Sequence, residues 1–194
     1  MGTGDGTRRG RMVLIGGGAR SGKSALALRL AGAVPGPIVF VATAQAFDGE
    51  MQARIDRHRD ERSSRFVTHE EPTELAPLLA SLPAGSTVVI DCLTLWLSNL
   101  LLAGLDDAEV AARGGALIEV VRAREGLTVL VSNEVGLGLV PDNALGRRFR
   151  DEAGRLHQRA AAAADEVYGG LMGLMMRLKP GPVEAVTAGG WRDE

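Results

Sequence analysis

The chain has 194 residues and a formal net charge of −2 at pH 7, and this length fits one α/β domain with a substantial core. The near-neutral charge gives no support for broad binding to nucleic acid, so we expect no nucleic-acid partner. The single cysteine, Cys92, excludes an internal disulfide framework and a cysteine-based zinc site. We expect Cys92 to be a buried, inert thiol within a strand.

The two ends of the chain carry no pattern of a folded element. Residues 1–11 are rich in Gly and Arg and lack the apolar segment of a signal peptide. No apolar run reaches the about 18 residues that a transmembrane helix needs. We therefore expect a disordered leader over 1–11, a single domain over 12–179, a tail over 180–194, no membrane span and a cytoplasmic protein.

The domain begins with an apolar strand over residues 12–15, a glycine-rich turn and a helix from Ser24, and the turn matches the P-loop pattern in full. Glycines leave room for consecutive backbone N–H groups to surround a phosphate, and the helix start adds the positive end of its dipole. Lys23 would reach the β- and γ-phosphates as a catalytic residue, and the hydroxyl of Ser24 would ligate Mg²⁺. The predicted nucleotide-binding residues are Gly17, Gly18, Ala19, Arg20, Ser21, Gly22, Lys23 and Ser24.

The use of lysine supports this interpretation. Lys23 and Lys179 are the only lysines among 22 basic residues, so the chain uses arginine almost wherever a cation suffices. One lysine falls at the P-loop position, where a compact ammonium is needed rather than a planar guanidinium. We therefore favour nucleotide binding over an ordinary glycine-rich turn.

Apolar runs and helical patterns alternate along the rest of the chain. Strands are predicted over residues 38–42, 66–68, 87–91, 127–132, 166–168 and 174–178. Helices are predicted over residues 48–62, 73–82, 94–103, 107–124 and 143–165. The apolar face of the last helix comprises Leu145, Phe149, Ala153, Leu156 and Ala160. This alternation predicts an α/β fold of three layers, with a mostly parallel central sheet between helices.

The strand over 87–91 ends in a carboxylate, Asp91, and resembles a Walker B strand. A carboxylate at such a strand end can hold Mg²⁺ directly or through water. We favour a nucleotide or Mg²⁺ role for Asp91, with Ser24 as a second metal ligand. Thr43 and Ala44 follow the strand over 38–42, at the end where ligands gather in open α/β sheets.

A basic segment surrounds His58. Five arginines and three acidic residues lie between positions 54 and 65, so the segment is net positive. One interpretation is a solvated helix with many ion pairs. The other is an anion site whose guanidiniums keep the imidazole of His58 neutral and nucleophilic, so that it can attack phosphorus. His157 has no such cluster around it in the sequence.

A third candidate segment, Asn133 to Gly138, follows the strand over 127–132 and should lie at the same sheet edge as the P-loop. Glu134 could bind substrate or metal, and it is also, with Asp91, a candidate for a general base. Alternatively, the segment is a turn that needs two glycines for backbone reasons. The sequence leaves both interpretations open.

Several stretches together resemble the bifunctional adenosylcobinamide kinase / adenosylcobinamide-phosphate guanylyltransferase family of cobalamin biosynthesis. The resemblance runs from about residue 12 to 179. The matching stretches are residues 17–24, 42–45, 48–51, 54–55, 58–59, 91–94, 98–101, 132–141, 149–155 and 164–168.

The resemblance implies a RecA-type P-loop NTPase fold, a homotrimer, and two reactions with ATP or GTP as substrates and Mg²⁺ as cofactor. In the first, the aminopropanol hydroxyl of adenosylcobinamide is phosphorylated. In the second, His58 accepts GMP from GTP and passes it to adenosylcobinamide phosphate, which gives adenosylcobinamide-GDP. Besides the P-loop, the implied nucleotide-binding residues are Ala42, Thr43, Ala44, Arg59, Asp60, Glu61, Arg62, Glu70 and Asp91.

Two other functions are consistent with a P-loop. A small-molecule kinase without guanylyltransfer would need the P-loop and Asp91 but not His58. A non-enzymatic nucleotide switch would bind nucleotide and form no covalent intermediate. The order of the matching stretches disfavours both.

Overall fold

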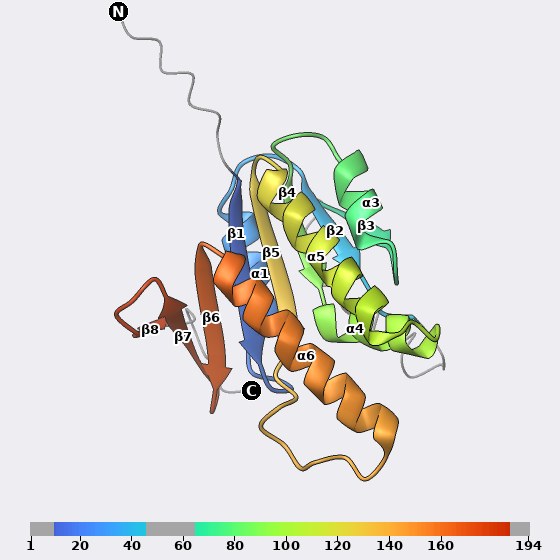
Figure 1. Ribbon diagram of the computed structural model, residues 1–194. Coiled ribbons are helices and arrows are strands. Elements are labelled where there is room, and N and C mark those ends of the chain that lie inside the picture. The colour runs from blue at the N-terminus through green and yellow to red at the C-terminus, as the bar shows by residue number, and fades with distance from the viewer. Residues whose placement is uncertain (1–9, 46–64, 187–194) are drawn as a thin grey trace, which may run out of the picture.

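A computed structural model describes residues 10–45 and 65–186 of the chain. In these residues, eight strands form one sheet in the order β3-β2-β4-β5-β1-β6-β7-β8 (Figure 1). Neighbours from β3 to β6 in this order run parallel, whereas β6–β7 and β7–β8 are antiparallel pairs. The strands are β1 (Arg11–Gly17), β2 (Ile38–Ala42), β3 (Phe66–Glu70), β4 (Thr87–Asp91), β5 (Leu127–Asn133), β6 (Glu166–Leu171), β7 (Leu174–Lys179) and β8 (Glu184–Val186).

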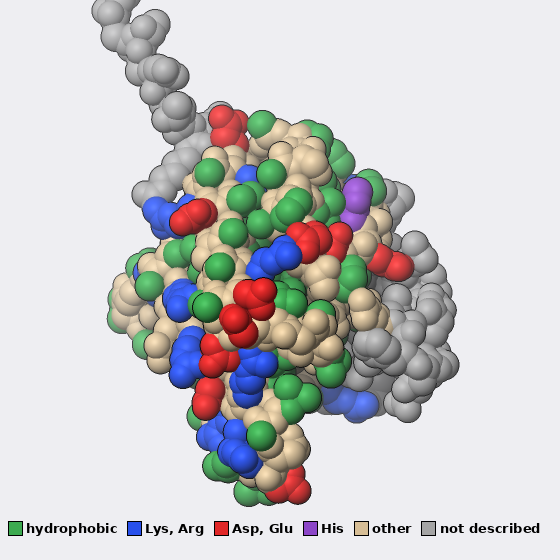
Figure 2. All heavy atoms as spheres, turned by 45° about the vertical axis from the view of Figure 1, so that its right-hand side comes forward, with side chains coloured by type: hydrophobic (Ala, Val, Ile, Leu, Met, Phe, Trp, Pro, Cys, Tyr) green, Lys and Arg blue, Asp and Glu red, His purple; other side chains and the backbone are tan. Residues whose placement is uncertain are grey.

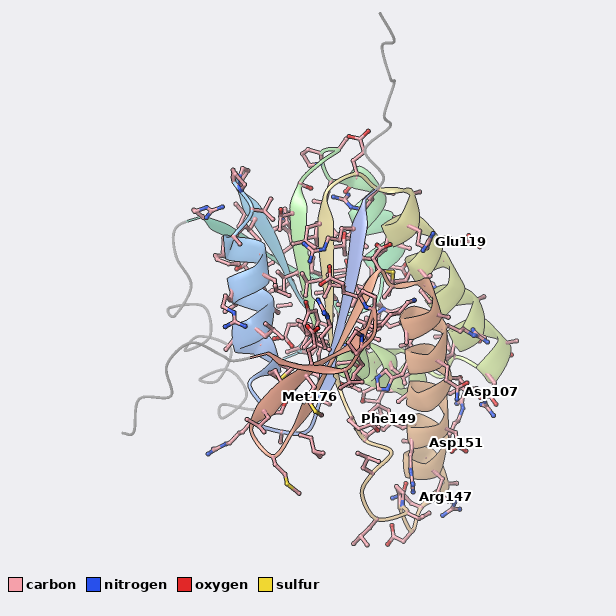
Figure 3. The ribbon with its side chains drawn as sticks, turned by 90° about the vertical axis from the view of Figure 1, so that its left-hand side faces the viewer. Asp107, Glu119, Arg147, Phe149, Asp151 and Met176 are labelled. Carbon is pink, nitrogen blue, oxygen red and sulfur yellow. The ribbon has the colours of Figure 1, made fainter. Side chains whose placement is uncertain are left out.

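Helices cover both faces of the sheet (Figures 1 and 3). Helix α1 lies on one face, and the other helices lie on the opposite face. None of the helices in the described ranges is both long and apolar enough to cross a membrane. The helices are α1 (Lys23–Gly32), α3 (Leu75–Ser81), α4 (Leu93–Leu102), α5 (Asp107–Ala123) and α6 (Ala144–Ala163).

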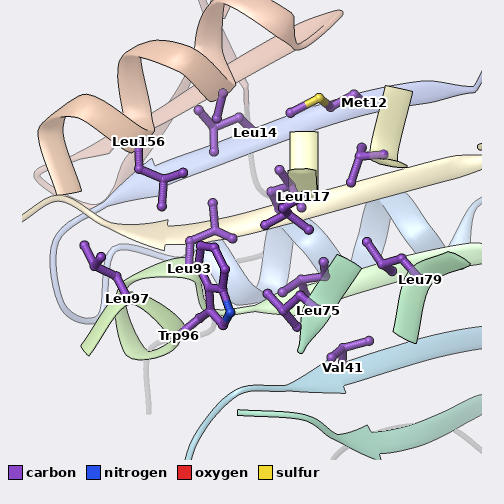
Figure 4. Packing of buried hydrophobic residues seen from close by; sticks show 14 of the residues in the cluster. Met12, Leu14, Val41, Leu75, Leu79, Leu93, Trp96, Leu97, Leu117 and Leu156 are labelled. Atoms are coloured by element: carbon purple, nitrogen blue, oxygen red, sulfur yellow. The ribbon is translucent and has the colours of Figure 1, made fainter. Parts of the chain in front are cut away.

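The central strands are continuous apolar runs because both of their faces are buried. Side chains alternate along β1, so that Val13 and Ile15 pack with α1 while Leu14 packs on the opposite face with α5 and α6. Figure 4 shows this second cluster, in which Leu117 and Leu156 lie over the strands. The three predicted layers follow directly from this alternation.

Local caps explain where the two long helices begin. Asp106 and Glu109 form a reciprocal capping box at the start of α5, and the side chain of Asn143 accepts a hydrogen bond from Gly146 N at the start of α6. The first turns of α6 extend beyond the sheet edge, so Leu145 of the predicted apolar face is 48% exposed. Farther along that face, Ala153, Leu156 and Ala160 are buried as expected.

Three further expectations, on the elements and on Cys92, differ from the structure. Arg11 belongs to β1 rather than to a leader, and residues 184–186 form β8 where a tail was expected. Strand β8 pairs with β7, and an Arg177–Glu184 ion pair joins the two strands. Cys92 follows β4 as the N-cap of α4 and is buried, and its burial, with Asp91 nearby, raises the pKa of the thiol. The helix expected over 48–62 lies outside the described residues.

Candidate active site

The sheet brings the candidate residues of four strands to one edge. In the register of the parallel strands, Gly17 lies opposite Asn133, and Asp91 lies opposite both Val131 and Ala42. The P-loop therefore follows β1 at the same edge where β5, β4 and β2 end. This is the edge at which parallel α/β sheets bind their ligands.

The P-loop turns tightly against β6. Gly22 adopts the left-handed region with φ 88°, which favours glycine at the residue before α1. A Cβ atom on Gly17 would lie 2.5 Å from Ser21 Oγ and 3.2 Å from the Cα atom of Gly170. A Cβ atom on Gly170 would in turn lie 2.8 Å from Met175 Sδ and 2.9 Å from Ser21 Cβ, so neither glycine has room for a side chain.

The polar groups of the loop fit an anionic ligand. Lys23 is only 9% exposed, and its Nζ donates a hydrogen bond to Gly18 O at 3.0 Å, so its ammonium lies across the loop. The hydroxyl of Ser21 is buried against Gly17 and Gly170 and has no hydrogen-bond partner within the described residues.

Ser24 and Asp91 meet although they are 67 residues apart. Ser24 Oγ, in the first turn of α1, donates a hydrogen bond to Asp91 Oδ2, at the end of β4, over 2.9 Å. A hydroxyl and a carboxylate are oxygen ligands of the kind that Mg²⁺ prefers. Across residues 10–45 and 65–186, no group of three or more His, Cys, Asp or Glu side chains could hold a metal. Mg²⁺ would thus need further ligands, such as phosphate oxygens or water.

The predicted site residues at the ends of β2 and β3 differ in exposure: Thr43 is buried and Glu70 is exposed. Thr43 is fully buried, and its hydroxyl bonds to both the carbonyl and the N–H of Cys92 at 2.8 Å. This hydroxyl is therefore engaged inside the protein, and it connects β2 to the start of α4. Ala42 and Glu70 lie opposite each other at the ends of β2 and β3, where Glu70 is exposed at the same sheet edge.

A cluster of three polar side chains lies beside the P-loop, and the sequence indicated only one of them, Glu134. Ser132 Oγ and His157 Nε2 are 2.6 Å apart, and His157 Nδ1 lies 3.8 Å from Glu134 Oε2. Burial lowers the pKa of His157 below its ordinary value of 6.5, and this effect outweighs the opposing effect of Glu134. The sequence around His157 carries no basic cluster, but α6 packs His157 against the end of β5 and so brings it to Ser132 and Glu134.

These three residues also line a mostly apolar cavity of about 300 Å³. The cavity lies between β1, α6 and the β6–β7 hairpin, and Figure 3 shows Met176 of its lining on that hairpin. Its apolar lining includes Leu14, Leu137, Ala161, Val167, Met176 and Leu178. Gly16 and Gly17 form the part of the lining next to the P-loop.

Of the predicted site residues, the structure brings the P-loop, Ala42, Thr43, Ala44, Glu70 and Asp91 to one edge of the sheet. The remaining predicted residues are His58, Arg59, Asp60, Glu61 and Arg62, which lie outside the described residues.

A P-loop between β1 and α1, with a Walker B-like carboxylate two strands away on β4, is the arrangement of a P-loop NTPase. A family model described as cobinamide kinase / cobinamide phosphate guanyltransferase matches residues 13–178, and the chain belongs to this family. The family and the enzyme class that the sequence resemblance indicated are therefore confirmed.

Curated relatives agree with the family model. The chain is 48% identical over 171 residues to the bifunctional adenosylcobalamin biosynthesis protein CobP of Pseudomonas aeruginosa, covering 88% of this chain and 98% of that protein. It is 42% and 38% identical, each over 181 residues, to proteins called CobU from Salmonella typhimurium and Escherichia coli. Each of these two alignments covers 87% of this chain and 99% of the relative.

Solved structures share the fold at low identity. The RadB recombinase aligns with a TM-score of 0.53 and 17% identity, covering 92% of this chain and 87% of that one. A protein of Pyrococcus horikoshii aligns with a TM-score of 0.55 and 10% identity, covering 88% and 86%. The predicted RecA-type, mostly parallel α/β fold is therefore confirmed.

Proposed function

We propose that the chain carries out both reactions implied by its family. It would phosphorylate the aminopropanol hydroxyl of adenosylcobinamide with ATP or GTP, and then transfer GMP from GTP to adenosylcobinamide phosphate. The single observation that best supports a phosphoryl-transfer site is the 2.9 Å contact between Ser24 of the P-loop and Asp91 of β4. Membership of a family described by both activities supports the second step.

In the kinase step, the N–H groups from Gly18 to Ser24 would bind the phosphates. Lys23 would leave Gly18 O for a phosphate oxygen and stabilise negative charge on the transferred group. Ser24 and Asp91 would hold Mg²⁺. When bound there, Mg²⁺ neutralises charge on the β- and γ-phosphates.

In the guanylyltransfer step, His58 would attack the α-phosphorus of GTP and pyrophosphate would leave. Attack requires a neutral imidazole, and the surrounding arginines favour that form. Arg59, Asp60, Glu61 and Arg62 would contribute to nucleotide binding, together with Glu70 at the end of β3. The GMP group would then pass from His58 to adenosylcobinamide phosphate.

Covalent labelling tests this proposal. The protein would be incubated with Mg²⁺ and GTP labelled at the α-phosphorus, then denatured and examined for bound label. We expect acid-labile, base-stable label on the wild type and no label on His58→Ala. The control is His69→Ala, which removes a histidine on β3 that is not the proposed nucleophile and should keep the label. Absence of label on a wild type that binds GTP would refute guanylyl-histidine formation.

We also propose a homotrimer, as the family resemblance implies. Exposed apolar side chains support self-association: Leu139 on the loop before α6 is 96% exposed, and Met172 at the β6–β7 turn is 92% exposed. Figure 2 shows apolar side chains on this loop, at the lower end of the molecule. Exposed apolar surface of this kind marks a site of protein–protein contact. Sedimentation equilibrium should give three times the chain mass of 20.4 kDa.

A further inference from the structure

The cavity beside the P-loop combines an apolar lining with a few polar groups. Its apolar walls come from β1, β6, β7 and α6, whereas Ser132, Glu134 and His157 supply polar groups. The hydroxyl of Tyr168, which also lines the cavity, is bonded to Glu166. Sites for small organic ligands are mostly apolar and carry a few convergent polar groups. The cavity has this character, and the Ser24–Asp91 pair is not part of its lining.

The cavity also lies next to the P-loop. Gly16 and Gly17 contribute to its wall, and Glu134 N donates a hydrogen bond to Gly17 O over 2.9 Å. The side chain of Glu134 is 38% exposed and remains accessible to a ligand. A group held in this cavity would thus lie beside the loop that binds the phosphates.

We propose that this cavity receives the hydroxyl-bearing arm of the corrinoid acceptor and that Glu134 is the general base of the kinase step. This inference rests on the kinase function proposed above. At about 300 Å³, the cavity is at the lower end of ligand pockets, so it suits an aliphatic arm while the macrocycle stays outside.

The reaction at this site is a single displacement. The hydroxyl oxygen of the arm forms a bond to the γ-phosphorus, and the bond from that phosphorus to the β–γ bridging oxygen breaks. The hydroxyl proton goes to the carboxylate of Glu134, and the nucleoside diphosphate leaves with the electron pair of the broken bond.

The structure distinguishes Glu134 from Asp91, the other candidate base. Asp91 Oδ2 accepts the hydrogen bond of Ser24 and is thereby placed in the metal site. Glu134 Oε1 accepts a hydrogen bond from Gly136 N over 2.6 Å, while its other oxygen, Oε2, faces His157. The Gly136 contact fixes the carboxylate at the cavity wall and leaves Oε2 for a substrate hydroxyl.

His157 is a positioning residue in this arrangement. Its Nε2 pairs with the buried hydroxyl of Ser132, so the ring is held between β5 and Glu134. With Nδ1 protonated toward the carboxylate, Nε2 would accept the hydrogen bond from Ser132. The His157→Asn variant should lower kcat for phosphorylation and leave the KM for adenosylcobinamide unchanged. A merely structural role would lower thermal stability without this division between kcat and KM.

The decisive variant is Glu134→Gln, with Glu119→Gln as its control because Glu119 is exposed on α5, away from the cavity (Figure 3). We expect Glu134→Gln to lower kcat for adenosylcobinamide phosphorylation about 10²-fold or more, the usual effect of losing a general base. GTP affinity, measured by calorimetry, reports whether the variant folds. A folded Glu134→Gln enzyme with wild-type kcat would overturn the assignment.

A second pair of variants tests the occupant of the cavity. Ala161 lies in the cavity wall and Ala162, its neighbour on α6, is exposed. Ala161→Phe should raise the KM for adenosylcobinamide about tenfold while the KM for nucleotide stays constant, whereas Ala162→Phe should change neither. If Ala161→Phe instead alters only the oligomeric mass, the cavity receives a second copy of the chain and the proposal is wrong.

The wild-type enzyme separates the two possible failures. If the wild type does not phosphorylate adenosylcobinamide, the proposed function fails before any variant is considered. If the wild type is active and both Glu134→Gln and Ala161→Phe match it, the function stands and only the cavity assignment is refuted.

Discussion

Asn99 on α4 joins two loops at the active-site edge of the sheet, and we predict that its removal lowers the stability of the protein. Its side chain is 7% exposed, and its Nδ2 donates hydrogen bonds to Thr43 O over 2.9 Å and to Pro72 O over 3.0 Å. These carbonyls belong to the segments that follow β2 and β3. Replacing Asn99 with Ala removes both donors and leaves a fully buried carbonyl, that of Thr43, without this partner.

The magnitude follows from the two acceptors. A buried polar group that loses its partner costs about 1–3 kcal/mol, and the Pro72 carbonyl, being less buried, costs less. We expect Asn99→Ala to lower the free energy of unfolding by about 2–4 kcal/mol. For a protein of this size each kcal/mol lowers Tm by about 2–4 °C, so Tm should fall by roughly 4–16 °C.

Urea unfolding followed by circular dichroism measures this change. The control is Ser98→Ala, a half-buried neighbour on the same helix for which no such pair of contacts exists among the described hydrogen bonds. We expect the control to change stability by less than about 0.5 kcal/mol. If Asn99→Ala and Ser98→Ala give the same unfolding midpoint and slope, Asn99 does not stabilise these two loops.

Three further predictions concern the fold and the P-loop. Since the pKa of His157 is lowered in the folded protein, the unfolded chain binds a proton on this imidazole more tightly than the folded chain does. The free energy of unfolding should therefore fall as pH drops below 6.5, and it should fall less in His157→Asn. Urea unfolding at a series of pH values measures both. Gly170→Ala places a Cβ 2.9 Å from Ser21 Cβ in the P-loop and should raise the Kd for nucleotide about tenfold in calorimetry, while an unchanged Kd would refute the contact. Leu117→Ala, at 1% exposure, should cost about 2–5 kcal/mol in chemical unfolding, whereas Leu102→Ala, at 62% exposure, should cost little; equal losses would contradict the packing.

Signals that are local in the chain were interpreted correctly from the sequence. Continuous apolar runs predicted β2, β4 and β5, since strands buried on both faces need no polar alternation. The predicted starts of α5 and α6, residues 107 and 143, lie within one residue of the observed starts, where Asp106 and Asn143 cap the helices. The position of the P-loop was equally local, because glycines and Lys23 follow the first strand directly.

Signals that depend on a distant partner were not found. Residues 184–186 were predicted to be part of a tail, yet they form strand β8, which pairs with β7. Thr43 was predicted to be a nucleotide-binding residue, and no local pattern indicated that its hydroxyl bonds to Cys92, 49 residues away. Leu145 was expected on a buried face, but the sheet ends before the first turns of α6.

The sequence by itself determined the class of fold, the order of its elements and the P-loop, because each depends on residues that are neighbours in the chain. Only the tertiary structure decided which polar groups meet. Ser24 reaches Asp91 across 67 residues, and Ser132 reaches His157 across 25. Such contacts depend on strand order and on the rotation of α6 about its axis, and neither is encoded in a short stretch of residues. The cavity that Ser132, Glu134 and His157 share is therefore a property of the packed sheet and helices.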